Sequence, residues 1–164
     1  PAFADRNWEK YQTILSGDIG VANDSTDNCY HVFYHPEDMN LDSNSILDGF
    51  VIMNGFADGL ESNGYGAGMA NYSGSQLIKN CNFKNNSAIR GGGCLNMNCN
   101  QKYYNCLFEM NKASSNGGSI SDYGANTYFI NCKFRKNEAT EGACIFFYNC
   151  NSIILNCLFI LMKC

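Results

Sequence analysis

A four-residue pattern, Asn-Cys-x-Phe, recurs four times in this chain and constrains its fold more than any other feature. The copies follow one another at intervals of 25, 26 and 25 residues. A unit of this length is too short to bury an apolar face alone, so neighbouring units must stack and share one core. The repeat therefore predicts a solenoid. The copies are Asn80–Phe83, Asn105–Phe108, Asn131–Phe134 and Asn156–Phe159.

The rest of each unit repeats as well. An Asn follows the Phe by three residues, an Ala comes two residues later, and a glycine corner leads into an apolar position at Leu95, Ile120 and Ile145. Another apolar row precedes each Cys by three residues. One unit thus offers three short extended runs separated by corners. The further Asn residues are Asn86, Asn111 and Asn137, and the apolar row is Ile78, Tyr103, Phe129 and Ile154.

The extended runs are strands rather than helices. None shows the i, i+3, i+4 spacing of an amphipathic helix, and the many Gly and Asn residues disfavour helix formation. Three strands in each unit, paired in parallel with the same strands of the next unit, give an all-β parallel β-helix. Its turns, or rungs, contain about 25 residues and lie about 4.8 Å apart.

The repeated residues are expected to have structural roles. Cys and Phe at i and i+2 of a strand point to the same side, which their apolar character places inward. This predicts a column of Cys81, Cys106, Cys132 and Cys157, and a column of Phe83, Phe108, Phe134 and Phe159. Asn tolerates left-handed backbone and bonds to nearby backbone groups. We therefore expect one corner ladder of Asn80, Asn105, Asn131 and Asn156, and another of Asn86, Asn111 and Asn137.

The chain reads as one elongated domain. Residues 1–45 are interpreted as an irregular first rung, with strands at 14–18 and 30–34, and as a partial cap that includes Trp8 and Tyr11. Residues 46–164 form the rungs, and 56–65 is expected to be a loop. The apolar run 157–164 has no polar terminal repeat to cover it. We expect truncation and continuation into further rungs, or end-to-end self-association through that end.

Composition excludes some classes of function. The net charge is −4 and the eleven Lys and Arg residues are scattered, so no basic face for nucleic acid is expected. The chain has no apolar stretch of about 18 residues, the length needed to span a membrane. No cofactor motif is recognised.

The ten cysteines are not read as a disulfide scaffold. Those of the repeat are expected to be buried thiols that pack as small hydrophobes. Cys94 and Cys144 are assigned to one column with Ser119 between them, two rungs apart and beyond bonding distance. The Cys spacings do not form a zinc pattern. This cysteine pattern is compatible with an oxidising and with a reducing compartment.

Two acidic features are candidate sites. Asp18, Asp24 and Asp27 could offer oxygen ligands to calcium, but the segment lacks a regular calcium-loop pattern and a solvated loop is favoured. Asp122 falls in the column assigned to Met97 and Phe147, which points inward, and a buried carboxylate would be a functional candidate. We expect instead that the strand ends early and that Asp122 caps a turn with Tyr123 and Gly124.

The combination Asn-Cys-x-Phe-x-x-Asn-x-Ala-x-x-Gly-Gly-Gly, as in 80–93, resembles the repeat of polymorphic outer membrane proteins. The segment around Arg6–Glu9, 14–20 and 47–50 is similar to the first rungs of secreted right-handed β-helix proteins of the pectate-lyase-like superfamily. The resemblance implies a right-handed β-helix and an extracellular or cell-surface location. It specifies the fold strongly and the activity weakly.

Two classes of function follow. The favoured one is a noncatalytic adhesin-like or structural module that binds a glycan or protein along its side, with exposed aromatic residues as anchors. The alternative is a polysaccharide lyase or glycoside hydrolase, which requires clustered carboxylates. The regular rungs carry only Glu109, Asp122, Glu138 and Glu141, which do not recur in one column. No catalytic residue is therefore assigned.

Overall fold

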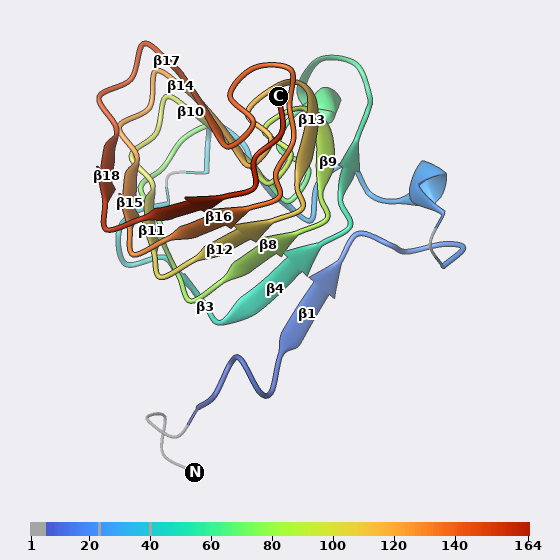
Figure 1. Ribbon diagram of the computed structural model, residues 1–164, viewed down its shortest axis with the longest axis horizontal. Helices are drawn as coiled ribbons and strands as arrows, with labels where there is room; N and C mark the ends of the chain where they lie inside the picture. Colours follow the sequence, from blue (N-terminus) through green and yellow to red (C-terminus); the bar gives the residue numbers. More distant parts are fainter. Residues whose placement is uncertain (1–5, 23, 40) are drawn as a thin grey trace.

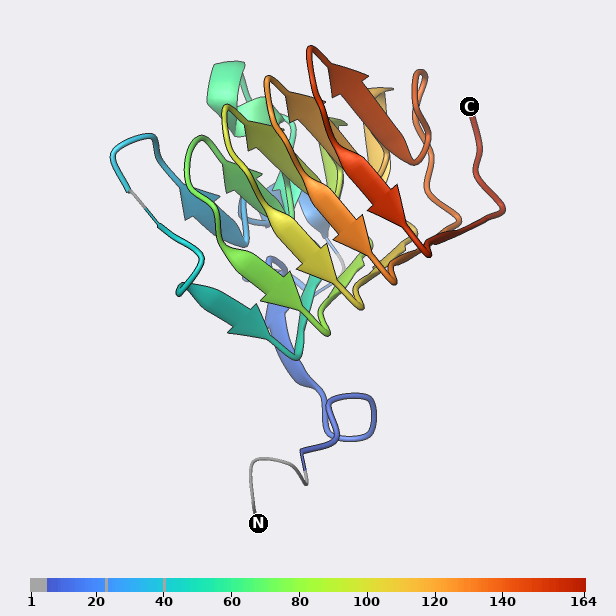
Figure 2. The same cartoon turned by 90° about the vertical axis from the view of Figure 1, so that its left-hand side faces the viewer.

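The chain winds through successive turns into a parallel β-helix, as predicted (Figure 1). The structure is a computed structural model that describes residues 6–164 except 23 and 40. Each complete turn contributes one strand to each of three main sheets. Equivalent strands of successive turns lie side by side, so that the sheets run along the stack (Figure 2).

All neighbouring strands in these sheets are parallel. Sheet A contains β1 (Thr13–Ser16), β4 (Phe50–Met53), β8 (Asn82–Lys84), β12 (Leu107–Glu109), β16 (Lys133–Arg135) and β19 (Leu158–Ile160). Sheet B contains β2 (Phe33–His35), β6 (Met69–Asn71), β10 (Cys94–Met97), β14 (Ile120–Tyr123) and β17 (Ile145–Tyr148). Sheet C contains β3 (Ile46–Asp48), β7 (Leu77–Lys79), β11 (Lys102–Tyr104), β15 (Tyr128–Ile130) and β18 (Ile153–Leu155).

A fourth, smaller sheet adds to the three strands expected in each unit. Sheet D contains β5 (Phe56–Ala57), β9 (Ser87–Arg90) and β13 (Lys112–Asn116). The segment 56–65, expected to be a loop, therefore begins as a strand, and it also contains a short 3-10 helix, η3 (Glu61–Gly64). A second such helix, η2, spans Ser25–Asp27. The small residues Ala57 and Ala88 pack in this corner, which lets the backbone of adjacent turns pair there.

The phenylalanine column is confirmed. Phe83, Phe108 and Phe134 are fully buried and stack face to face, with ring centres 4.9 and 5.0 Å apart. Phe159 continues the stack at 5.0 Å from Phe134 but remains 44% exposed, because it lies in the last turn. A second stack, Tyr103 on Phe129, meets the first at steep angles. Aromatic stacking thus fills the interior from turn to turn.

The cysteine column is buried over three turns. Cys81, Cys106 and Cys132 are each at most 2% exposed, whereas Cys157 in the last turn is half-buried. All ten cysteines of the chain are free thiols in this structure. The Cys106 thiol donates to the carbonyl of Ile78, 3.5 Å away. Burial raises the pKa of Cys81 to about 11, so this thiol stays protonated at neutral pH.

The second predicted asparagine ladder lies inside the protein. Asn86, Asn111 and Asn137 are fully buried. The Asn111 side chain accepts from the Asn86 backbone N–H at 3.1 Å and donates to the Phe83 carbonyl at 2.8 Å. Asn137 repeats these two contacts one turn later, at 2.9 and 3.0 Å. The amides therefore satisfy backbone groups that the corner leaves outside the sheets.

One register assignment was wrong, because the extra residue of the 26-residue unit lies earlier than expected. Ala113 pairs with Ala88 but Asn116 pairs with Arg90, so β13 contains a bulge between them. Beyond the bulge the columns of sheet B shift by one residue from the predicted register. Ile120 pairs with Cys94 and Ile145, whereas Leu95 pairs with Ser121. Cys94 therefore does not share a column with Ser119 and Cys144.

Candidate functional site

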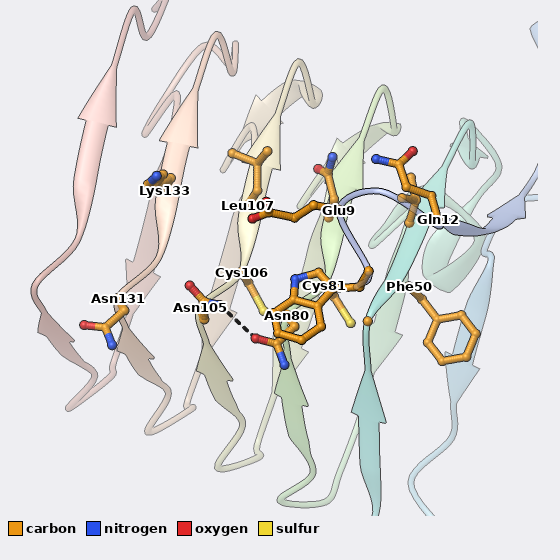
Figure 3. A pocket seen from close by; sticks show the side chains of 14 residues that line it. Glu9, Gln12, Phe50, Asn80, Cys81, Asn105, Cys106, Leu107, Asn131 and Lys133 are labelled. Carbon is orange, nitrogen blue, oxygen red and sulfur yellow. Dashed lines mark hydrogen bonds between the residues drawn. The ribbon is translucent and has the colours of Figure 1, made fainter. Parts of the chain in front are cut away.

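A groove runs along the outer corner where sheet C turns into sheet A (Figure 3). Its volume is about 270 Å³. Three corner asparagines follow one another along it, one for each turn, and the N-terminal segment 8–12 forms part of the lining. We call it the corner groove. It is lined by Trp8, Glu9, Gln12, Gly49, Phe50, Val51, Asn80, Cys81, Asn82, Asn105, Cys106, Leu107, Asn131 and Lys133.

Left-handed backbone turns the asparagines of the groove outward from the strands. Asn80, Asn105 and Asn131 all have φ of 54°, and Asn156 has φ of 50°. This conformation is unfavourable for most side chains but is tolerated by Asn. The corner ladder predicted from the repeat is therefore confirmed as a backbone feature. Because each of these turns has an Asn at this corner, the groove presents a carboxamide group at a regular interval.

Hydrogen bonds join the corner asparagines in two separate pairs. Asn105 donates to Asn80 at 2.8 Å, and Asn156 donates to Asn131 at 2.7 Å. No described residue bridges the two pairs through these amides. The carbonyl oxygen of Asn105 and the amide nitrogen of Asn131 are therefore open to a ligand in the groove. Figure 3 shows the two side chains on adjacent turns.

An ion pair fixes the N-terminal segment at the start of the groove. The Arg6 guanidinium lies 2.5 Å from the Asp48 carboxylate and 5.5 Å from the centre of the Trp8 ring. Asp48 also accepts from Asn80 at 2.8 Å. Partial burial acts to raise the pKa of Asp48, but the hydrogen bonds from Asn80 and Arg6 and the nearby cations together hold it below its ordinary value. The ionised carboxylate thus links the segment to the first corner asparagine.

The charges in the groove are few and balanced. Among the described lining residues Glu9 is the one acidic residue and Lys133 the one basic residue, and both are exposed. The remaining polar groups are amides of Asn and Gln, which both donate and accept hydrogen bonds. Trp8 adds a flat apolar ring. This combination suits a neutral ligand with many hydroxyl groups better than an ion.

The predicted calcium residues do not form a metal cluster. Asp24 caps η2 by accepting from the backbone and hydroxyl of Thr26, at 3.0 and 2.6 Å, and Asp27 accepts from the Val21 backbone at 2.6 Å. Asp18 lines a different pocket with Ser25 and Asn28. Among the residues that the structure describes, no three His, Cys, Asp or Glu side chains lie close enough to hold a metal ion.

Two other carboxylates of the regular turns, Glu109 and Glu138, are held by basic residues. Glu109 is 3% exposed and pairs with Arg135 and Lys84 on the outer side of sheet A. Glu138 pairs with Lys112 and Lys163 at 3.6 and 3.1 Å. These pairs lie on neighbouring turns and stabilise the outer face. They do not present two free carboxylates to a shared substrate.

Asp122 does not cap a turn, contrary to our expectation. It lies within β14, pairs with Asn96 and Phe147, and is fully buried. The Asn96 amide donates to it at 2.8 Å and the Ser152 hydroxyl at 3.1 Å. Burial, opposed by these hydrogen bonds, raises the pKa of Asp122 to about 6.

Asp122 ends a buried polar column that the sequence did not reveal. His35, Asn71, Asn96 and Asp122 occupy equivalent positions of four successive strands in sheet B. Adjacent side chains are hydrogen-bonded, at 2.6, 2.8 and 2.8 Å. The Tyr103 hydroxyl donates to Asn96 at 3.0 Å. The misplaced register hid this column, because it aligned Met97, rather than Asn96, with Asp122.

A second surface of interest is the outer side of sheet B and its adjoining corner. Tyr123 packs against Tyr148, and Tyr34 against Tyr72, with ring centres 5.9 and 5.7 Å apart. Tyr148 and Tyr34 are 63% and 47% exposed. We call this surface the tyrosine face. It consists of Tyr34, Tyr65, Tyr72, Tyr123, Tyr148 and Arg90.

The repeat does not place the N-terminal part of the corner groove, but it does contain a signal for the tyrosine face. The residues Trp8, Glu9 and Gln12 precede the first regular unit, so no periodic signal places them beside the corner asparagines. Tyr123 and Tyr148 are 25 residues apart and pair directly. That spacing was a usable signal for the tyrosine face.

Comparison with known proteins adds no functional assignment. No family model, curated protein or solved structure matches the chain. Within the described part of the chain, no helix is long and apolar enough to cross a membrane.

Proposed function

We propose that this protein is a noncatalytic binding module that holds a neutral glycan in the corner groove. The observation that carries the proposal is the open amide pair of Asn105 and Asn131 in a groove that Trp8 also lines. The location we propose, extracellular or at the cell surface, rests on the resemblance of the repeat to surface and secreted β-helix proteins.

The chemistry of the groove supports a sugar ligand. The flat face of an indole packs against the C–H groups of a pyranose ring, which excludes water from both. Sugar hydroxyls donate and accept hydrogen bonds, as do carboxamides. Asn105 offers an acceptor and Asn131 a donor one turn away. Small-molecule sites are typically concave and partly apolar, with a few polar groups positioned to bind the ligand.

The alternative function, a polysaccharide-cleaving enzyme, has less support at this site. Hydrolysis of a glycoside ordinarily uses two carboxyl groups, about 5–10 Å apart, on either side of the bond that is cleaved. Among the described lining residues Glu9 is the one carboxyl, and Asp48 is engaged by Arg6 and Asn80. The described part of the groove therefore offers no second acid or base, which supports binding without cleavage.

A titration of the purified protein with neutral oligosaccharides tests the proposal. Candidates would first be chosen from an array and then measured by calorimetry. We expect Trp8→Ala to weaken binding by about tenfold or more, because it removes the stacking surface. Gln12→Ala should weaken it less. Tyr11→Ala is the matched control, since Tyr11 is 70% exposed and does not line the groove.

Each variant must keep the melting temperature of the wild type for the comparison to count. Equal affinity of the Trp8→Ala and Tyr11→Ala proteins would show that the corner groove is not the binding site. Failure of every neutral glycan to bind, while acidic glycans bind, would overturn the assignment of ligand class.

A further inference from the structure

The tyrosine face contains a cation without an acidic partner. Arg90 lies between two rings, with its guanidinium carbon 5.3 Å from the centre of Tyr65 and 5.8 Å from that of Tyr123. Among the described residues it forms no ion pair, and its Nε is buried without a hydrogen-bond partner. The nearby carboxylate of Glu141 accepts from Asn116 at 2.7 Å. Arg90 is thus held beside the two rings without a salt bridge among the described residues.

The arrangement of the rings indicates what the face can contact. Tyr123 and Tyr148 tilt by 42° relative to each other, and Tyr34 and Tyr72 by 55°. Neighbouring rings therefore do not stack face to face but cover part of each other's faces. A sugar needs an open ring face for stacking, whereas protein side chains pack against tilted aromatic edges. The Tyr72 hydroxyl is also buried without a partner among the described residues.

We infer that the tyrosine face is a docking surface for a protein segment that presents an Asp or Glu side chain among apolar residues. The carboxylate would pair with Arg90 and the apolar side chains would pack between the tyrosines. Tyr and Arg are the residues most enriched at the centres of protein interfaces. The Nε of Arg90 is buried, and partial removal of a guanidinium from water strengthens its attraction for a carboxylate.

Docking at this face does not depend on glycan binding. The tyrosine face lies outside sheet B, whereas the corner groove lies between sheets C and A. The two sites therefore share no residue. A variant of Trp8 should impair the groove alone, and a variant of Arg90 the tyrosine face alone.

A selection from a displayed library of random 12-residue peptides tests the inference with the 164-residue protein as target. Selected peptides would be synthesised, and their binding measured by fluorescence anisotropy. We expect the enriched peptides to share an Asp or Glu flanked by apolar residues. Arg90→Gln should weaken their binding about tenfold, which is the effect expected for loss of one charge-assisted contact. Lys102→Gln is the matched control, because Lys102 lies 5.9 Å from the ring of Tyr128 on another sheet.

Two further measurements make the outcome specific. Changing the acidic residue of the peptide to its amide should weaken binding to the wild-type protein about as much as Arg90→Gln weakens binding of the acidic peptide. When the amide peptide is combined with the Arg90→Gln protein, the affinity should fall little further. Tyr148→Ala, at a largely exposed position, should also weaken binding and does not depend on how Arg90 affects folding. Trp8→Ala should leave peptide affinity unchanged.

Peptides without an acidic preference, or equal affinity of the Arg90→Gln and Lys102→Gln proteins, would overturn the inference. So would Arg90-dependent binding of a uronic acid polymer in place of peptides, which would assign the face to an acidic glycan.

Discussion

Asparagine recurs in this protein because single residues must turn the chain sharply at each corner. Asn105 and Asn131 adopt left-handed backbone at the start of sheet A strands. At the other end of the same strands, Met110 and Lys136 adopt this conformation too, although it disfavours their side chains. The turn at that end is held by the buried ladder. The requirement for Asn is therefore strongest where no interior amide supports the turn.

Phe108 tests the stacked core at the scale of one residue. It lies between Phe83 and Phe134 and is fully buried, so Phe108→Ala leaves a cavity between two filled turns. We expect a loss of about 3–5 kcal/mol in the free energy of unfolding. Tyr104→Ala, at a position 45% exposed, should cost far less. Urea denaturation measures both, and similar losses would contradict the proposed register.

Asp122 predicts a dependence of stability on pH. Its pKa is raised to about 6 in the folded protein from an ordinary value of 3.8, chiefly by burial. The folded state therefore binds the proton more tightly than the unfolded state. The contribution of Asp122 to the free energy of unfolding is fully present below about pH 4 and is lost as the pH rises through about 6. The loss is of the order of 3 kcal/mol, from about 1.4 kcal/mol for each pKa unit.

Asp122→Asn should remove this loss. The amide can still accept from Asn96 and can donate to Ser152, so the column stays hydrogen-bonded. We expect the variant to melt above the wild type at pH 7.5, with the difference shrinking toward pH 4. Asp48→Asn is a control with the opposite expected effect. The pKa of Asp48 is lowered, so its stabilising contribution is present above pH 4 and the variant should melt below the wild type at pH 7.5. An Asp122→Asn variant that melts below the wild type at pH 7.5 would contradict the assignment.

At the scale of strands and turns, the repeat predicted most of the structure because each column has one chemical requirement. Phe83 and its equivalents, Cys81 and its equivalents, and Asn86 and its equivalents lie where the period placed them. The position of the inserted residue could not be predicted. Ser114 and Ser115 fit a bulge and a corner equally well, since a small polar residue satisfies either. That single ambiguity displaced the columns of sheet B and hid the polar column.

Two thiols of the cysteine column, Cys81 and Cys106, should react slowly with alkylating reagents. Burial raises the pKa of Cys81 to about 11 and that of Cys106 well above its ordinary value, so neither forms the reactive thiolate at neutral pH. We expect iodoacetamide to label the exposed Cys164 first in the native protein. All ten thiols should be labelled after denaturation without reductant. Mass spectrometry distinguishes the sites, and pairs of unlabelled repeat cysteines after denaturation would show disulfides instead.

At the scale of the whole molecule, apolar surface gathers on the last turn. The outward positions of β16 are Lys133 and Arg135, but the paired positions of β19 are Leu158 and Ile160. Strand β19 also ends sheet A, so one edge of it is unpaired among the described residues. Unpaired strand edges with apolar side chains favour association.

We therefore expect the 164-residue chain to self-associate through its last turn. Sedimentation equilibrium should show an average mass that rises with concentration. Ile160→Lys should reduce the association, because a charged side chain at an edge strand opposes pairing with another chain. A monomer at every concentration, with the same mass in the variant, would contradict the expectation.

The central claim is that the molecule binds a glycan without cleaving it. The most direct measurement is prolonged incubation with a neutral oligosaccharide of defined length that binds the corner groove, followed by mass spectrometry of the recovered sugar. Glu9 is the one carboxyl group among the residues described in the groove, so we predict recovery of the intact oligosaccharide with no shorter or unsaturated product. Shortened or unsaturated products whose formation is abolished by Glu9→Gln would contradict the account and identify an enzyme.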